Sequence, residues 1–165
     1  LLECHTIVDK LEKKLKKEID KVEYITVHVN PYHKLEEFNL TDACDDDKDF
    51  IFNMVEKLTP KKDISNYVNK HLKDTKIIKK NDQVIGIVIY YKENSKYLLD
   101  LIYIKDKYQN LGIGHNIIKN LIDNQKKNKT QLEVFKSNIK AIKLYKNLGF
   151  QITSETKNKY IMEVN

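Results

Sequence analysis

The chain has 165 residues, 30 lysines and no arginine, and carries a formal net charge of +6. This length is typical of one domain, and no apolar run approaches the ~20 residues of a membrane span, so we expect no membrane partner. The lysines are spread out without interleaved aromatic residues. This favours a solvated surface over a nucleic-acid-binding stripe, although a positive field suits an anionic cofactor.

The cysteines and histidines point away from a metal site or a disulfide framework. Cys4 and Cys44 form no CxxC pattern, and the five histidines are scattered. Because the first residues also lack the layout of a signal peptide, we expect two reduced thiols, a cytoplasmic location and no metal.

The first 30 residues predict a helix and then a strand. Apolar residues recur at helical spacing between lysines, which predicts an amphipathic helix over residues 6–21. β-Branched residues fill 22–30 up to Pro31, which is typical of a strand. We treat residues 1–21 as an extra N-terminal helix, not as a separate domain.

Two further helices are predicted before the main run of strands. Residues 41–58 begin with acids and continue as an apolar stripe, with Thr41 or Asp42 as the predicted N-cap. Residues 63–73 show a second apolar face, with Asp63 as the predicted cap.

The rest of the chain alternates between strand and helix patterns. Asn81-Asp82 between two apolar runs predicts a hairpin, and the largely apolar 96–104 predicts a central strand buried on both faces. Next come a helix at 113–127, a strand at 130–135, a helix at 138–148 ended by Gly149, and a closing antiparallel pair, QITSE and KYIMEV. This order predicts an α/β domain on one mixed sheet.

Two of the four glycines, Gly112 and Gly114, lie between the third strand and the next helix. Glycines at a helix start let backbone amides approach an anion such as a phosphate. His115 and Asn116 follow where a Walker loop needs Lys and Ser or Thr, and a Rossmann fingerprint would need a third glycine. Tight packing of strand against helix is the alternative explanation.

The run IYIKDKYQNLGIG, residues 102–114, resembles the acetyl-CoA signature of the GNAT superfamily of N-acetyltransferases, Gln/Arg-x-x-Gly-x-Gly/Ala after a hydrophobic strand. Asn110 and Leu111 depart from the residues common in that loop. NIKAIKLYKNLGF resembles the second motif of the family at its five marked positions, which are Asn138, Ala141, Tyr145, Gly149 and Phe150. The resemblance extends over residues 22–165 and leaves the first helix outside.

The resemblance implies an α/β (α+β) fold with a mixed, mostly antiparallel central sheet flanked by helices. It also implies acetyl-CoA as cosubstrate, with pantetheine along Ile102, Tyr103 and Ile104 and with Asn138 and Tyr145 beside it. The pyrophosphate would lie on the loop amides, those of Gln109, Asn110, Leu111, Gly112, Ile113 and Gly114. The expected partner is a small-molecule or peptide amine and not a nucleic acid; a homodimer is left open.

The implied chemistry is attack of an amine on a thioester, so a base must take the ammonium proton and an acid can protonate the leaving thiolate. Tyr145 matches the tyrosine of the family and is the predicted acid, with packing as its alternative role. Asp100 is the predicted base or amine-binding residue, unless it is a buried structural partner. Glu133 is the second candidate, unless it faces solvent or a neighbouring strand.

The acidic run at 42–49 has two interpretations, a site for a cationic acceptor such as a polyamine or a solvated helix start. The overall hypothesis is a GNAT-type N-acetyltransferase. A sensor that binds acetyl-CoA without turnover and a basic nucleic-acid-binding protein are the alternatives. An enzyme releases CoA when amines are added, whereas a sensor binds acetyl-CoA without any release. Salt-dependent binding to DNA without affinity for acetyl-CoA would favour the nucleic-acid-binding protein.

Overall fold

The computed structural model describes residues 38–58, 63–125 and 128–165, so the predicted helix 6–21 and strand 22–30 lie outside the described residues. Four of the regular elements are helices: α2 (Lys48–Leu58), α3 (Ile64–His71), α4 (Ile113–Asp123) and α5 (Ile139–Asn147). The strands are β1 (Asn39–Asp42), β2 (Thr75–Lys80), β3 (Gln83–Glu93), β4 (Lys96–Ile104), β5 (Lys129–Phe135), β6 (Gln151–Glu155) and β7 (Lys159–Val164).

The described strands form one seven-stranded sheet in the order β1-β2-β3-β4-β5-β7-β6. Every neighbouring pair is antiparallel except β4 and β5, which run parallel. The expected mixed, mostly antiparallel sheet is therefore confirmed, and β4 takes its middle position. None of the helices in the described part of the chain combines the length and the hydropathy of a membrane span.

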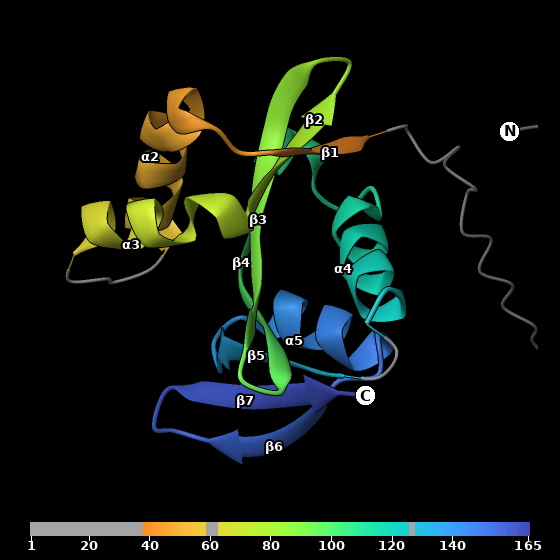
Figure 1. Ribbon diagram of the computed structural model, residues 1–165. Helices are drawn as coiled ribbons and strands as arrows, with labels where there is room; N and C mark the ends of the chain where they lie inside the picture. Colours follow the sequence, from red (N-terminus) through yellow and green to blue (C-terminus); the bar gives the residue numbers. More distant parts are fainter. Residues whose placement is uncertain (1–37, 59–62, 126–127) are drawn as a thin grey trace, which may run out of the picture. The chain divides into compact units, whose positions relative to one another are not determined.

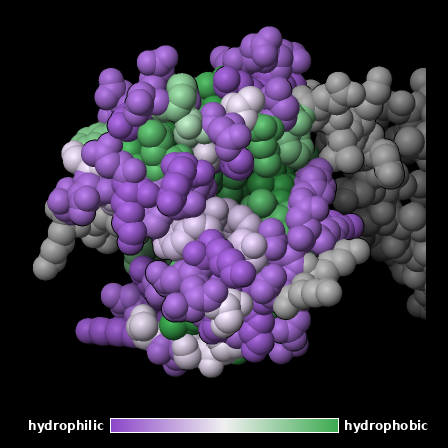
Figure 2. All heavy atoms as spheres, viewed as in Figure 1, coloured by the Kyte–Doolittle hydropathy of each residue, from purple (hydrophilic) through white to green (hydrophobic). Residues whose placement is uncertain are grey.

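Helices cover both faces of this sheet, and each face has its own core. Figure 1 shows α2 and α3 on one side of the sheet and α4 on the other. Ile51, Val55 and Val68 of α2 and α3 pack on one face, whereas residues of α4 and α5 such as Ile117 and Ile142 pack on the opposite face. Hydrophilic residues cover most of the face drawn in Figure 2, with smaller hydrophobic patches between them.

The hairpin and several predicted helix ends are confirmed. Asn81 and Asp82 have φ of 47° and 61° and join β2 to β3, since both residue types tolerate left-handed backbone. The side chain of Asp63 accepts a hydrogen bond from the Asn66 amide at 3.0 Å and caps α3. Gly149 follows α5 with a φ of 90°.

The predicted helix 41–58 is wrong at its beginning. Thr41 and Asp42 belong to β1, which pairs with β2, and Thr41 lies opposite Ile77. A short 3-10 turn then begins at Asp45, and the capping box is made by Cys44 and Asp47. Pairing with a sheet edge is a long-range contact that outweighs the local capping preference. The predicted helix 113–127 is also too long, because α4 ends at Asp123.

The prediction that strand 96–104 is buried on both faces is also wrong. β4 is central, but only Leu99 and Leu101 are buried, and its last three residues are half-buried. The continuously buried run lies instead in β3, from Ile85 to Ile89. β4 is less covered because it loses its neighbour β5 halfway along, as described below.

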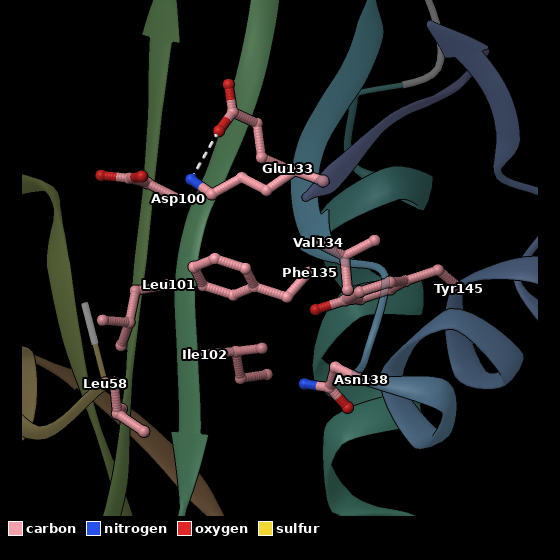
Figure 3. A pocket seen from close by; sticks show the side chains of 10 residues that line it. Leu58, Asp100, Leu101, Ile102, Glu133, Val134, Phe135, Asn138 and Tyr145 are labelled. Atoms are coloured by element: carbon pink, nitrogen blue, oxygen red, sulfur yellow. Dashed lines mark hydrogen bonds and ion pairs between the residues drawn. The ribbon is translucent and has the colours of Figure 1, made fainter. Parts of the chain in front are cut away.

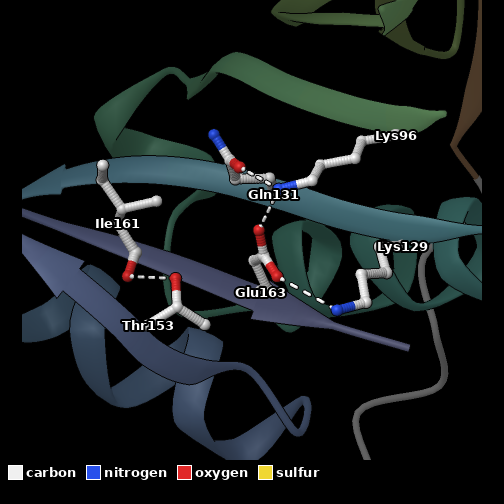
Figure 4. Close-up of polar contacts among 6 residues, drawn as sticks. All are labelled: Lys96, Lys129, Gln131, Thr153, Ile161 and Glu163. Atoms are coloured by element: carbon white, nitrogen blue, oxygen red, sulfur yellow. Dashed lines mark hydrogen bonds and ion pairs between the residues drawn. The ribbon is translucent and has the colours of Figure 1, made fainter. Parts of the chain in front are cut away.

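A polar network links β4, β5 and β7 where these strands are still paired (Figure 4). It consists of Lys96, Gln131 and Glu163. The Lys96 ammonium donates hydrogen bonds to Gln131 Oε1 and Glu163 Oε1, and Lys129 lies 3.6 Å from the other carboxylate oxygen. The hydrogen bond from Lys96 lowers the pKa of Glu163 from its ordinary value of 4.5. The charged form is therefore stabilised by folding.

Replacing Glu163 by Gln is expected to reduce the free energy of unfolding by about 1–3 kcal/mol at neutral pH, since two lysines lose their carboxylate. Because the folded pKa is lowered, this stabilisation is present above the ordinary pKa and is lost as pH falls through the folded value. Denaturant unfolding at several pH values should show a flatter acid dependence in the variant. Glu155→Gln removes an equal charge from the exposed Lys136 pair and should change stability by less than about 0.5 kcal/mol; equal losses in both variants would contradict the assignment.

Candidate active site

β4 and β5 separate in the middle of the sheet. Their parallel pairing joins Lys96–Leu99 of β4 to 129–132 of β5 and stops there, although the strands continue to Ile104 and Phe135. Asp100 is the extra residue of a β-bulge, because Leu99 pairs with Tyr90 and Leu101 with the adjacent Ile89. A bulge bends its strand and re-aims a side chain, so it accounts for the loss of pairing with β5.

A cleft of about 330 Å³ occupies this region (Figure 3). Its lining is Leu58, Asp100, Leu101, Ile102, Glu133, Val134, Phe135, Asn138, Tyr145 and Lys159. Ile102 and Val134 belong to the core under α4 and α5, whereas Leu101 belongs to the core under α2 and α3. Since side chains alternate along a strand, Glu133 and Phe135 face the same side as Leu101. The cleft is thus lined from both faces of the sheet.

Tyr145 lies on α5 with 8% of its surface exposed, and its ring packs edge-on against Phe150 at 5.7 Å. Figure 3 shows its hydroxyl directed into the cleft. Burial raises the pKa of Tyr145 to about 12. The phenol is therefore protonated at neutral pH and chemically able to donate a proton.

Asn138 lies at the start of α5 and lines the same cleft. Its side-chain oxygen accepts a hydrogen bond from the Ala141 amide at 3.1 Å, which makes it the N-cap of the helix. In Figure 3 the side chain lies beside Ile102 at the edge of the cleft. The capping contact fixes the residue without removing it from the cleft.

Asp100 accepts a hydrogen bond from the Tyr67 hydroxyl of α3. The Tyr67 ring lies 4.8 Å from that of the buried His71, and His71 lies 4.5 Å from the ring of Tyr91. Burial and the hydrogen bond with Asp100 raise the pKa of Tyr67, so it stays a donor. Asp100 has this structural partner and also lines the cleft; its carboxylate points away from the Tyr145 hydroxyl (Figure 3). Sequence reasoning missed Tyr67, which is 33 residues away.

The predicted phosphate loop connects the end of β4 to the start of α4 and does not line the cleft. Asn110 and Gly112 have φ of 61° and 79°, and Gly112 is the N-cap of α4. The Gln109 side chain donates hydrogen bonds to the Ile104 carbonyl at 2.8 Å and to Asp106 at 2.9 Å. The side-chain amide of Gln109 thus holds the loop onto the end of β4. The expectation that the loop contacts a phosphate mainly through its backbone stays a prediction.

The two glycines of the loop differ in their surroundings. A Cβ atom at Gly112 would meet no atom within 4 Å, so this position needs glycine for its left-handed backbone. A Cβ atom at Gly114 would lie 3.4 Å from the Ile104 side chain and 3.9 Å from that of Leu144. Both distances are ordinary van der Waals contacts, so close packing of β4, α4 and α5, the alternative explanation, does not by itself require glycine at position 114.

The remaining acids make contacts of their own. Glu133 forms an ion pair with Lys159 of β7 at 2.9 Å, so it has the cross-strand contact that was its alternative role. In the acidic run, Asp42 pairs with Lys76 and Asp45 with Lys48, and no residue of the run lines the cleft. Among the described residues, no group of three or more His, Cys, Asp or Glu could hold a metal ion.

Comparison with known proteins adds to this geometry. Residues 40–150 match the acetyltransferase (GNAT) family. A spermine/spermidine N(1)-acetyltransferase of Bacillus subtilis is 36% identical over 67 residues, covering 38% of this chain and 44% of that protein. The acetyltransferase PseH of Campylobacter jejuni is 31% identical over 86 residues, 51% of this chain and 55% of that protein. The chain thus spans about half the length of these curated relatives.

Solved structures share the fold at lower sequence identity. Arabidopsis thaliana Naa50, solved with a bisubstrate analogue of CoA and a peptide, superposes with a TM-score of 0.66 at 22% identity. The superposition covers 78% of this chain and 98% of that one. This likeness supports the architecture of the sheet and its helices.

Proposed function

The chain belongs to the acetyltransferase (GNAT) family, and from this premise we propose that it transfers an acetyl group from acetyl-CoA to an amine. The observation that carries the proposal is the cleft between β4 and β5, which is lined from both faces of the sheet. Tyr145 lines it from one side and Asp100 from the other. Two substrates can therefore approach the same point from opposite faces.

The backbone of β4 suits a pantetheine arm at this gap. The Lys105 amide donates to the Ile85 carbonyl of β3, so by alternation Tyr103 also turns its backbone toward β3. Ile102 and Ile104 turn their backbone groups the other way, toward the gap. We assign the pairing with pantetheine to these two residues and leave Tyr103 as a strand residue between them.

The loop after β4 suits the pyrophosphate. The N-terminus of α4 offers free amides and the positive end of the helix dipole, and Gly112 adds no side chain in front of them. The proposed contacts are the backbone amides of Gln109, Asn110, Leu111, Gly112, Ile113 and Gly114. Of these, the Gln109 N–H already donates to the Asp106 carbonyl at 3.1 Å and would have to exchange that hydrogen bond. Calorimetric titration with acetyl-CoA tests this half of the proposal, and heats no larger than those of dilution would refute it.

The amine must lose a proton before it attacks, since a free ammonium has a pKa near ~10. We assign that proton to Asp100, directly or through a water molecule. The neutral nitrogen then forms a C–N bond to the thioester carbonyl carbon. The C–S bond breaks as the tetrahedral intermediate collapses, and the leaving sulfur takes the proton of the Tyr145 hydroxyl, which is protonated until then. The nitrogen still carries two protons after the attack; it loses one of them as the neutral amide forms, and that proton restores the Tyr145 phenol.

Replacing Tyr145 by Phe should lower kcat roughly a hundredfold while leaving the affinity for acetyl-CoA nearly unchanged, because only the proton donor is removed. The ring and its contact with Phe150 stay in place, so the unfolding midpoint should hold. Steady-state kinetics measure the effect. Tyr97→Phe, at the stacked Tyr90 pair outside the cleft, is the matched control; a normal kcat in Tyr145→Phe would remove the acid role.

Among amines, a polyamine is a more specific candidate for the acceptor. The relative from Bacillus subtilis is named for spermine and spermidine, and Asp100 and Glu133 give this cleft two carboxylates. A peptide amine is the competing class, since Naa50 was solved with a peptide analogue. Comparing the initial rates with spermidine and with a short peptide separates the two classes.

A further inference from the structure

The part of the cleft on the α2 and α3 side of the sheet already holds an ammonium group. Lys159 Nζ lies 2.9 Å from Glu133 Oε2 and 5.0 Å from the centroid of the Phe135 ring. Lys159 is the register partner of Phe135, so it reaches over from β7 to β5. All three residues line the cleft.

A carboxylate beside an aromatic face is a favourable environment for an amine cation. The ring attracts the cation through its quadrupole, and the carboxylate attracts it through its charge. Here the cation is supplied by the protein. The same two groups would attract the ammonium of a ligand that enters the cleft.

The pair is easy to exchange, in contrast to the network of Figure 4. Glu163 has 14% of its side chain exposed and binds two lysines where the strands are paired. Glu133 and Lys159 have 52% and 36% of their side chains exposed. An exposed pair of this kind contributes about 0–1 kcal/mol, so a competing cation can displace Lys159 at little cost.

The position of the pair relative to Asp100 suggests how an acceptor would lie. Leu99 and Leu132 form the last parallel pair of β4 and β5, and Asp100 and Glu133 are the next residues on the two strands. Both carboxylates line the cleft, separated by the widening gap. Leu58, Leu101 and Phe135 supply apolar surface between and beside them, which suits methylene groups.

We propose that Lys159 occupies a subsite for a second cationic group of the acceptor, and that the preferred acceptor is an alkyl diamine. Its second ammonium displaces Lys159 from Glu133 and Phe135, while its reacting amine lies at Asp100. The inference rests on the proposed acetyl transfer and deepens it. It makes Glu133, Phe135 and Lys159 specificity-determining residues.

The test compares diaminobutane with butylamine, which has the same chain and one charge. In Lys159→Met the competing cation is gone while the methylene stem is kept, so the KM for diaminobutane should fall roughly threefold to fivefold. In Glu133→Gln that KM should rise roughly tenfold. The KM for butylamine should change much less than that for diaminobutane in both variants, and the KM for acetyl-CoA should not change. Glu163→Gln, which removes a carboxylate from the same strand as Lys159, should leave the ratio of the two amines unaltered.

Calorimetric titration of each amine in the presence of CoA gives a readout that needs no turnover. If no amine is acetylated but Lys159→Met still tightens diaminobutane binding, the subsite stands and the proposed function fails. If acetylation occurs and neither variant changes the preference for diaminobutane over butylamine, the subsite proposal is overturned. If no amine is acetylated and Lys159→Met does not tighten diaminobutane binding, both the proposed function and the subsite are overturned.

Discussion

Replacing Gly112 by Glu is expected to weaken acetyl-CoA binding at least a hundredfold. The new carboxylate would lie at the N-terminus of α4, beside the amides assigned to the pyrophosphate. The negative charges of the carboxylate and the pyrophosphate would repel each other there. A Cβ atom there meets no atom within 4 Å, so the only internal cost is the φ of 79°. For a residue with a side chain this strain is about 1–2 kcal/mol, which a domain of this size tolerates. Calorimetry with acetyl-CoA measures the loss.

Two further variants at Gly112 separate charge from strain. Gly112→Gln has the same length and the same strain without the charge, and should bind more tightly than Gly112→Glu. Gly112→Asn tolerates left-handed backbone and should be the mildest of the three. A folded Gly112→Glu protein with unchanged affinity would refute the phosphate-loop assignment. Gly114→Glu is the companion test at the second glycine, since a Cβ atom there would make ordinary van der Waals contacts with Ile104 and Leu144 and the fold should be retained.

The second large effect is expected at Asp100. Asp100→Asn should lower kcat roughly a hundredfold to ten-thousandfold, the range for loss of a general base. The amide keeps the shape and can still accept the hydrogen bond from Tyr67, so the fold should be retained. Steady-state kinetics with saturating acetyl-CoA measure the loss, and circular dichroism checks the fold.

Tyr67 provides a check on this role because it touches Asp100 and is assigned no contact with substrate. Tyr67→Phe should raise the KM for the amine more than that for acetyl-CoA, and should add little to the loss in an Asp100→Asn background. If the kinetic losses of Tyr67→Phe and Asp100→Asn simply add in the double variant, Tyr67 contributes only packing. Normal turnover in Asp100→Asn would move the base role to Glu133 or to water.

Local patterns predicted much of this fold. Asn81-Asp82, Asp63 and Gly149 lie where the sequence placed a hairpin, a cap and a helix end, because each of these features depends on the backbone preferences of one or two residues. The motifs around Gly112 and Asn138 indicated the family without any knowledge of the strand pairing. Strand β1 could not be predicted in this way, since four residues become a strand only when β2 is beside them.

The polar contacts of the cleft were less predictable for the same reason. The bulge at Asp100 depends on the register between β3 and β4, and it turns the residue toward Tyr67 of α3. The contact of Lys159 with Glu133 joins residues 26 apart in the sequence. Composition and residue spacing do not predict such long-range partners. The sequence therefore could not decide whether Asp100 and Glu133 have catalytic or structural roles.

We propose that the cleft between β4 and β5 brings acetyl-CoA and an amine together for reaction. The decisive experiment measures release of free CoA from acetyl-CoA with a panel of amines that includes diamines, monoamines and short peptides. We expect release that depends on the amine and is largely lost in Gly112→Glu and Asp100→Asn. Binding of acetyl-CoA with no release above the uncatalysed rate for any amine would contradict the claim.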